Sequence, residues 1–117
     1  HKNNLKNYLS IRENLMIQGL KLDSFNLDLL ERFNLRRHID NSVGTLSFGQ
    51  QKKLSLMRVI NSDKNILILD EPFVGLDQNS KEFLKNFMEA KVKENKTVIF
   101  TSHIDFKDDY REIKING

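Results

Sequence analysis

The chain has 117 residues, of which 38% are hydrophobic and 30% are charged, a size and composition typical of roughly one globular domain or part of one. Its net charge of +3 is modest, and the basic residues are interspersed with acidic ones, which favours a hydrated surface over nucleic-acid binding. Cysteine is absent, which excludes disulfides and thiolate metal sites, and no apolar run reaches the roughly 18 residues that a membrane-spanning helix requires.

Two short amphipathic helices are predicted in the first third of the chain. Ser10 and Glu13 form a capping-box pattern that places a helix start at Ser10, and Gly19 is a candidate stop signal. A second helix is predicted to begin near Asp23 or Ser24. These helices either form a helical subdomain or contribute to a common core. The apolar residues expected on their inner faces are Ile11, Leu15 and Met16 in the first helix and Phe25, Leu29, Leu30 and Phe33 in the second.

A third helix is predicted to begin at Phe48, because Ser47 and Gln50 form another capping-box pattern. Gly49 in its first turn permits a close approach of the backbone to another molecule. A serine hydroxyl, a glycine backbone and the open N–H groups of a helix N-terminus together favour an anion. A well-capped core helix and a phosphate site are both compatible with this pattern. The residues expected to point into the core are Leu54, Met57 and Ile60.

An apolar segment from Ile66 to Leu69 runs directly into Asp70 and Glu71, which Pro72 follows. Such a segment predicts a strand that is buried on both faces of a parallel sheet. Carboxylates fit the C-terminal end of this strand, where open α/β sheets bind ligands, and a proline ends the pairing. Two adjacent carboxylates suggest a cation site and a general base, and hence phosphate chemistry. Taken alone, an ordinary turn after a strand explains the segment equally well.

Three further elements are predicted after this strand. Residues 78–94 fit a helix, Thr97–Phe100 fits a second buried strand, and Glu112–Ile115 fits a short final strand. The apolar face expected on the helix consists of Phe83, Leu84, Phe87 and Met88. The resulting order of strand, helix and strand is typical of a parallel sheet.

Four segments, in this order and at this spacing, resemble the motifs of ATP-binding-cassette (ABC) ATPases. Leu46–Gln50 is similar to the LSGGQ signature, which tolerates variation at its third position. Ile66–Pro72 resembles the Walker B strand with its catalytic glutamate. Val74–Asp77 resembles the D-loop, with valine in place of the usual serine, and Thr101–His103 matches the segment of the switch histidine. The resemblance implies an α/β fold of the partial P-loop NTPase type, with parallel core strands and a helical subdomain.

The resemblance also implies a division of the chain. A helical subdomain would occupy about residues 1–46. The signature helix, Walker B strand, D-loop and switch-histidine region would occupy about residues 47–117. No G-x-x-x-x-G-K-[ST] segment, the Walker A loop that cradles the β- and γ-phosphates, occurs in the sequence. We therefore interpret the chain as a C-terminal fragment of an ABC-type ATPase, and expect the fragment alone to be inactive.

Roles around ATP and Mg²⁺ follow from the same resemblance. Asp70 would bind Mg²⁺, and Glu71 would act as the general base that deprotonates the attacking water. His103, the second residue implied to be catalytic, would contact the γ-phosphate near Glu71. His1 stands where the family has its Q-loop glutamine.

ABC ATPases act as head-to-tail dimers, which assigns further residues of this chain to the opposite site. Ser47, Gly49 and Gln50 would contact the γ-phosphate of the nucleotide held by the second subunit. Asp77 would couple the two nucleotide sites across the dimer interface. The implied partners are a second ATPase subunit and integral-membrane permease subunits. Nucleic acid is not expected as a partner, and the chain itself is not expected to span the membrane.

Three short matches point to one branch of the family, the haem exporter ATPase of cytochrome c biogenesis. They are the segment His1–Lys6, the run Gln50–Lys53, and the acidic Asp105 close behind the switch histidine. The implied function is haem export for cytochrome c maturation, at the cytoplasmic face of the inner membrane. Another ABC transporter ATPase with a different cargo, a soluble ABC ATPase without a transport role, and a location on the matrix side of a mitochondrion are the alternatives.

Overall fold

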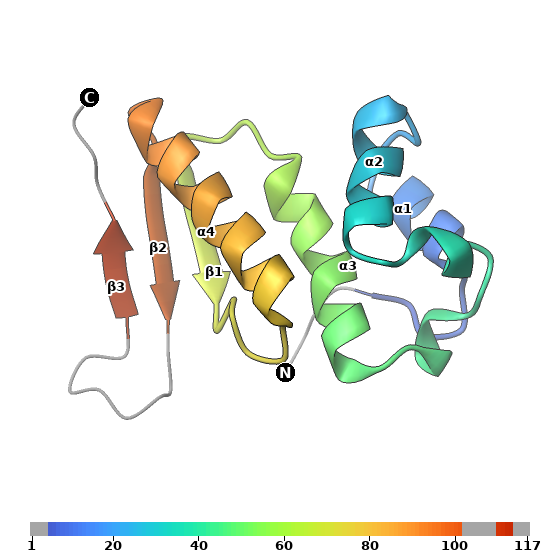
Figure 1. The fold of residues 1–117 in the computed structure, drawn as a ribbon. Coiled ribbons are helices and arrows are strands. Elements are labelled where there is room, and N and C mark those ends of the chain that lie inside the picture. The colour runs from blue at the N-terminus through green and yellow to red at the C-terminus, as the bar shows by residue number, and fades with distance from the viewer. Residues whose placement is uncertain (1–4, 102–109, 114–117) are drawn as a thin grey trace. The chain divides into compact units, whose positions relative to one another are not determined.

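The structure of the chain, a computed structural model, describes residues 5–101 and 110–113. Its internal contacts define two compact units, His1–Asn61 and Ser62–Gly117 (Figure 1). The first unit is helical and the second contains the sheet. The sequence-based division near residue 46, which separates regions by their implied function, stays a prediction.

The helical unit contains three α-helices and two short 3-10 helices in its described part. A capping box at Ser10 starts the first helix, and Asp23 caps the second, as predicted. Gly19, at φ +80°, ends the first helix in a left-handed conformation that costs glycine little. The elements are α1 (Ile11–Ile17), α2 (Ser24–Arg32), η1 (Arg36–His38), η2 (Val43–Thr45) and α3 (Phe48–Ile60).

Most of the predicted apolar faces are buried, but two residues are not. Met16 is 66% exposed, because α1 buries the face made by positions 11, 14 and 15, and position 16 lies about 100° farther around the helix. Phe25 is 53% exposed, because the buried face of α2 is centred on Asn26, Leu30 and Phe33 and leaves position 25 at its margin. The prediction that Met16 and Phe25 lie on the inner faces of their helices was therefore wrong. Leu54, Met57 and Ile60 of α3 are buried as predicted.

The described part of the second unit contains a three-stranded sheet and one helix. Its elements are β1 (Ile66–Asp70), α4 (Gln78–Lys93), β2 (Thr97–Thr101) and β3 (Tyr110–Ile113). The strand order is β1-β2-β3; β1 and β2 are parallel, and β2 and β3 are antiparallel. The last strand is described as Tyr110–Ile113 and pairs with β2 from Thr101–Tyr110 to Val98–Ile113; of the predicted Glu112–Ile115, the last two residues lie outside the described part.

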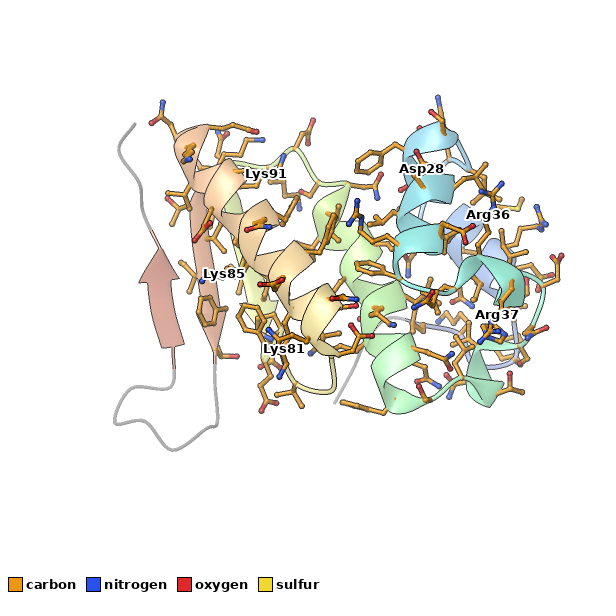
Figure 2. All side chains as sticks on the ribbon, in the orientation of Figure 1. Asp28, Arg36, Arg37, Lys81, Lys85 and Lys91 are labelled. Atoms are coloured by element: carbon orange, nitrogen blue, oxygen red, sulfur yellow. The ribbon has the colours of Figure 1, made fainter. Side chains whose placement is uncertain are left out.

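Helix α4 packs against the sheet through one face and presents charge on the other (Figure 1). Leu84, Met88 and Val92 are buried on the inner face, whereas Lys81 and Lys85 are exposed (Figure 2). The helix follows β1 and leads into β2, which runs in the same direction. It is therefore the crossover that parallel pairing requires.

In the part of the chain that the structure describes, strand β1 is buried on one face only, which differs from the predicted two buried faces. Leu67 and Leu69 are 4% and 3% exposed, whereas Ile66 and Ile68 are 57% and 69% exposed. Successive side chains of a strand point to opposite faces of its sheet. In the described part of the chain, only one of these faces is covered.

A buried asparagine ties the segment before α1 to that helix. Asn14 is 1% exposed, and its side-chain oxygen accepts the Lys6 amide at 2.7 Å. Its side-chain nitrogen donates to the carbonyl oxygens of Lys6 at 3.0 Å and Ser10 at 2.9 Å. Both carbonyl oxygens also accept a backbone amide, from Leu9 and from Asn14 itself, so the Lys6 N–H is the group that depends on the Asn14 side chain for its acceptor.

We predict that Asn14→Ala lowers the free energy of unfolding by about 1–3 kcal/mol, because it removes these side-chain hydrogen bonds and leaves the Lys6 amide without its acceptor. Urea unfolding followed by circular dichroism measures the change. Asn7→Ala, at an exposed position of the same segment, is the control and should change stability by less than about 0.5 kcal/mol. Equal stabilities of the two variants would contradict the assigned role.

Candidate functional site

Asp70 and Glu71 lie where β1 ends, and both contact the last residue of β2. Asp70 and Thr101 are register partners in the parallel pair. The Thr101 hydroxyl donates to Asp70 Oδ1 at 2.5 Å, the length of a charge-assisted bond. The Glu71 amide donates to the Thr101 carbonyl oxygen at 3.1 Å and to its hydroxyl oxygen at 3.2 Å. Thr101 therefore contacts both residues of the pair, although the sequence analysis assigned no separate role to it.

The backbone turns sharply at Glu71. This residue has φ +45°, a left-handed conformation that costs a residue with a side chain roughly 1–3 kcal/mol. The Val74 amide donates to the Glu71 carbonyl oxygen at 3.2 Å and closes the turn. Pro72 is buried, and the Phe73 ring meets the Phe100 ring of β2 edge to face, with centroids 5.8 Å apart. These contacts fix the turn, so that the backbone changes direction at Glu71 instead of continuing along β1.

Asp77, the candidate D-loop residue, has a structural role that the sequence analysis did not identify. It is the N-cap of α4, and its side chain accepts the Ser80 amide at 2.8 Å. An aspartate at this position satisfies one of the open N–H groups and interacts favourably with the helix dipole. The signal was present in the sequence, because Asp77 immediately precedes the predicted helix. The cap gives the aspartate a role in the fold of its own unit.

The signature segment in the helical unit forms the predicted capping box. The Gln50 amide donates to Ser47 Oγ at 3.1 Å, and the Ser47 amide donates to Gln50 Oε1 at 2.8 Å. Ser47 uses its oxygen as an acceptor in this cap, so the hydroxyl hydrogen can still be donated to another group. Gln50 likewise keeps its side-chain NH₂ group for donation. The cap and a polar contact with a ligand are therefore chemically compatible.

Open backbone amides lie beside these side chains. The first N–H groups of a helix have no acceptor within the helix, and here they belong to Phe48 and Gly49, next to the capped Gln50 amide. Phe48 is 58% exposed and Ser47 is also exposed, so this end of α3 is accessible within its unit. The segment combines N–H donors, a hydroxyl and the positive end of a helix dipole. An anion is the ligand that this combination suits.

Two of the predicted site residues, His1 and His103, lie outside the described residues. Asp70 and Glu71 are brought together in the sheet unit, and Ser47, Gly49 and Gln50 are brought together in the helical unit. Within the described ranges, no group of three or more His, Cys, Asp or Glu side chains is arranged to enclose a metal ion. None of the described helices is long and apolar enough to cross a bilayer.

A family match and a similar solved structure relate this chain to known proteins. The family model described as ABC transporter matches residues 1–74, which include the signature segment and the carboxylate pair. A solved ATP-binding subunit of an ABC transporter superimposes with a TM-score of 0.62 at 20% identity, covering 82% of this chain and 50% of that one. This likeness confirms the predicted fold class, a partial P-loop NTPase fold of mixed α/β type.

The names of the similar curated proteins refer to different transported substances. The Nod factor export ATP-binding protein I of Rhizobium meliloti is 32% identical over 108 residues, which cover 86% of this chain and 32% of that protein. The cytochrome c biogenesis ATP-binding export protein CcmA of Roseobacter denitrificans is 32% identical over 106 residues, covering 90% and 52%. The chain thus spans about a third to a half of these relatives, and identity singles out neither of them. The chain belongs to the ABC transporter family, as part of its ATP-binding domain.

Proposed function

We propose that this chain is part of a subunit that hydrolyses ATP to drive transport across a membrane. The observation that carries the proposal is the carboxylate pair Asp70–Glu71 at the C-terminal end of a parallel strand, which is where sheets of this class act on ligands. The anion-binding character of the helix that begins with Phe48 supports it independently. Both features lie in the part of the chain that the family model matches.

In this proposal Asp70 is the protein ligand of Mg²⁺. Magnesium in phosphate-transfer sites binds one or two carboxylates and completes its coordination with phosphate oxygens and water. Asp70 supplies one such carboxylate at the edge of the sheet, and the Thr101 hydroxyl restricts its orientation. The residue therefore fits the role. A bound Mg²⁺ would neutralise charge on the phosphates during transfer.

Glu71 is the proposed general base, and it would orient and deprotonate the water that attacks the γ-phosphate. Its position one residue beyond the proposed Mg²⁺ ligand places the base next to the phosphates that the cation would bind. The turn at φ +45° carries its side chain out of the line of β1. His103 is proposed to act with Glu71 by contacting the γ-phosphate, and His1 to take the place of the Q-loop glutamine.

The signature segment is proposed to act on a second subunit. Ser47, Gly49 and Gln50 would donate hydrogen bonds to the γ-phosphate of the nucleotide held by the partner, and Asp77 would couple the two sites. This arrangement requires a dimer of ATPase subunits, with membrane permease subunits providing the path for the cargo. The sequence holds no Walker A segment. We therefore expect ATP hydrolysis from the complete ATPase domain and none from the 117-residue chain alone.

A narrower proposal concerns the cargo. We propose haem export for cytochrome c maturation, from the cytoplasmic face of the inner membrane or, in a mitochondrion, from the matrix side. The segments His1–Lys6 and Gln50–Lys53 support it, as does the match to a cytochrome c biogenesis export protein over 90% of the chain. A different cargo has comparable support from the Nod factor export relative. Only an experiment on the cargo separates the two.

Glu71→Gln in the complete ATPase domain should lower kcat for ATP hydrolysis by about 10²–10⁴-fold, because it removes the base and keeps the shape of the side chain. Phosphate release at saturating Mg²⁺ and ATP measures the effect. Glu82→Gln, the same substitution at an exposed position of α4, is the matched control and should keep the wild-type rate. Unchanged turnover in Glu71→Gln would remove Glu71 from the catalytic role.

Substitutions of Ser47 separate the cap from the phosphate contact. Ser47→Ala should destabilise the protein by about 0.5–2 kcal/mol through loss of the N-cap, whereas Ser47→Asp should retain stability because aspartate caps equally well. The added carboxylate would repel a phosphate, so Ser47→Asp should nevertheless lose ATPase activity in the complete domain. Thermal unfolding and phosphate release measure the two effects. An active Ser47→Asp protein would contradict the proposed contact with the γ-phosphate.

The cargo is tested in the organism that encodes the protein. Replacing the gene with its Glu71→Gln form should abolish c-type cytochromes with covalently attached haem, measured by haem staining after denaturing electrophoresis. The Glu82→Gln form should leave them at normal levels. Normal haem attachment in cells whose Glu71→Gln protein lacks ATPase activity would exclude haem export and favour another cargo.

A further inference from the structure

We propose that Thr101 is a positioning residue that orients both Asp70 and Glu71 for catalysis. The inference rests on the proposed function of those two carboxylates and adds a residue to it. The Thr101 hydroxyl donates to Asp70 Oδ1 at 2.5 Å and accepts the Glu71 amide at 3.2 Å. One side chain from β2 therefore contacts the proposed Mg²⁺ ligand and the backbone of the proposed base.

The strand register explains why this residue can reach both. Asp70 and Thr101 are partners at the ends of two adjacent parallel strands. Side chains that are level with each other on neighbouring strands point to the same face of a sheet, so the hydroxyl lies beside the carboxylate. Glu71 is the next residue, and its amide points back to β2, where the Thr101 carbonyl oxygen also accepts it at 3.1 Å.

The chemistry of a hydroxyl suits this double role. A threonine hydroxyl has one hydrogen to donate and two lone pairs to accept with. A carboxylate only accepts and a backbone amide only donates, so the direction of each bond is fixed. The bond to Asp70 restricts rotation of its carboxylate. The bonds to the Glu71 amide hold a residue in the left-handed conformation, which side chains disfavour.

The test compares three substitutions of Thr101 in the complete ATPase domain. Thr101→Val keeps the shape and the branched carbon but has no hydroxyl, Thr101→Ala removes both, and Thr101→Ser keeps the hydroxyl. Thr97→Val, at the other end of the same strand, is the matched control because Thr97 pairs with Ile66 and not with a carboxylate.

Binding of Mn²⁺, as a spectroscopic substitute for Mg²⁺, is measured by electron paramagnetic resonance with a non-hydrolysable ATP analogue present. Thr101→Val and Thr101→Ala should weaken Mn²⁺ binding about tenfold, the loss expected for one charge-assisted hydrogen bond. Both should also lower kcat at saturating Mg²⁺, because the base is misplaced. Thr101→Ser should restore most of both properties, and Thr97→Val should match the wild type. If Thr101→Val does not fold, the contrast between Thr101→Ala and Thr101→Ser decides the question.

Wild-type Mn²⁺ affinity and kcat in folded Thr101→Val or Thr101→Ala would overturn the proposal. Equal losses in Thr101→Ser and Thr101→Ala would overturn it as well, because the hydroxyl would then be irrelevant. A wild-type protein that binds Mn²⁺ but does not hydrolyse ATP would refute the proposed function. In that case the Mn²⁺ affinities alone still decide whether Thr101 positions Asp70.

Discussion

The parallel pairing of β1 with β2 is the constraint on which the candidate site depends. It sets Asp70 level with Thr101, and from that register follow the hydroxyl bond to the carboxylate and the two acceptors for the Glu71 amide. A shift of one residue would turn every side chain of the strand to the other face. Within β1 such a shift would exchange Leu67 and Leu69 for the equally apolar Ile66 and Ile68, but it would turn the Asp70 carboxylate to the buried face, which is the cost that opposes it.

Helix caps fix the positions of the residues in two other motifs, the signature segment and the D-loop segment. Ser47 starts α3 and Asp77 starts α4, and each side chain satisfies an amide of the first turn. Both residues belong to segments that resemble nucleotide-binding motifs. The side-chain oxygens that cap the helices therefore lie in segments for which a role at the nucleotide is proposed. A hydroxyl can do both at once, since it accepts in the cap and still donates elsewhere. Asp77, as a carboxylate, has no hydrogen to donate, and its cap gives it a structural role beside the coupling proposed for it.

The local elements of this fold could be predicted from the sequence because their signals are local. Capping boxes located the starts of α1 and α3, and the apolar segments located β1 and β2. The exposure of Ile66 and Ile68 could not be predicted, since it depends on which elements cover each face of the sheet. The role of Thr101 was equally inaccessible, because it follows from the register between strands that are 27 residues apart, from Asp70 to Thr97. The direction of the chain at Glu71 could not be predicted either, because it follows from the positive φ angle of this residue, which the amino-acid sequence does not reveal.

The candidate site depends on the hydrogen bonds that join the ends of β1 and β2 at Glu71. Hydrogen–deuterium exchange of backbone amides, followed residue by residue by NMR, tests it most directly. If the Glu71 amide is held by the two oxygens of Thr101, it should exchange at least about 100-fold more slowly than its intrinsic rate, as an amide in a stable local structure does. Exchange at the intrinsic rate, with the amides of β1 protected, would show that the carboxylate pair is not held against β2 and would contradict the account.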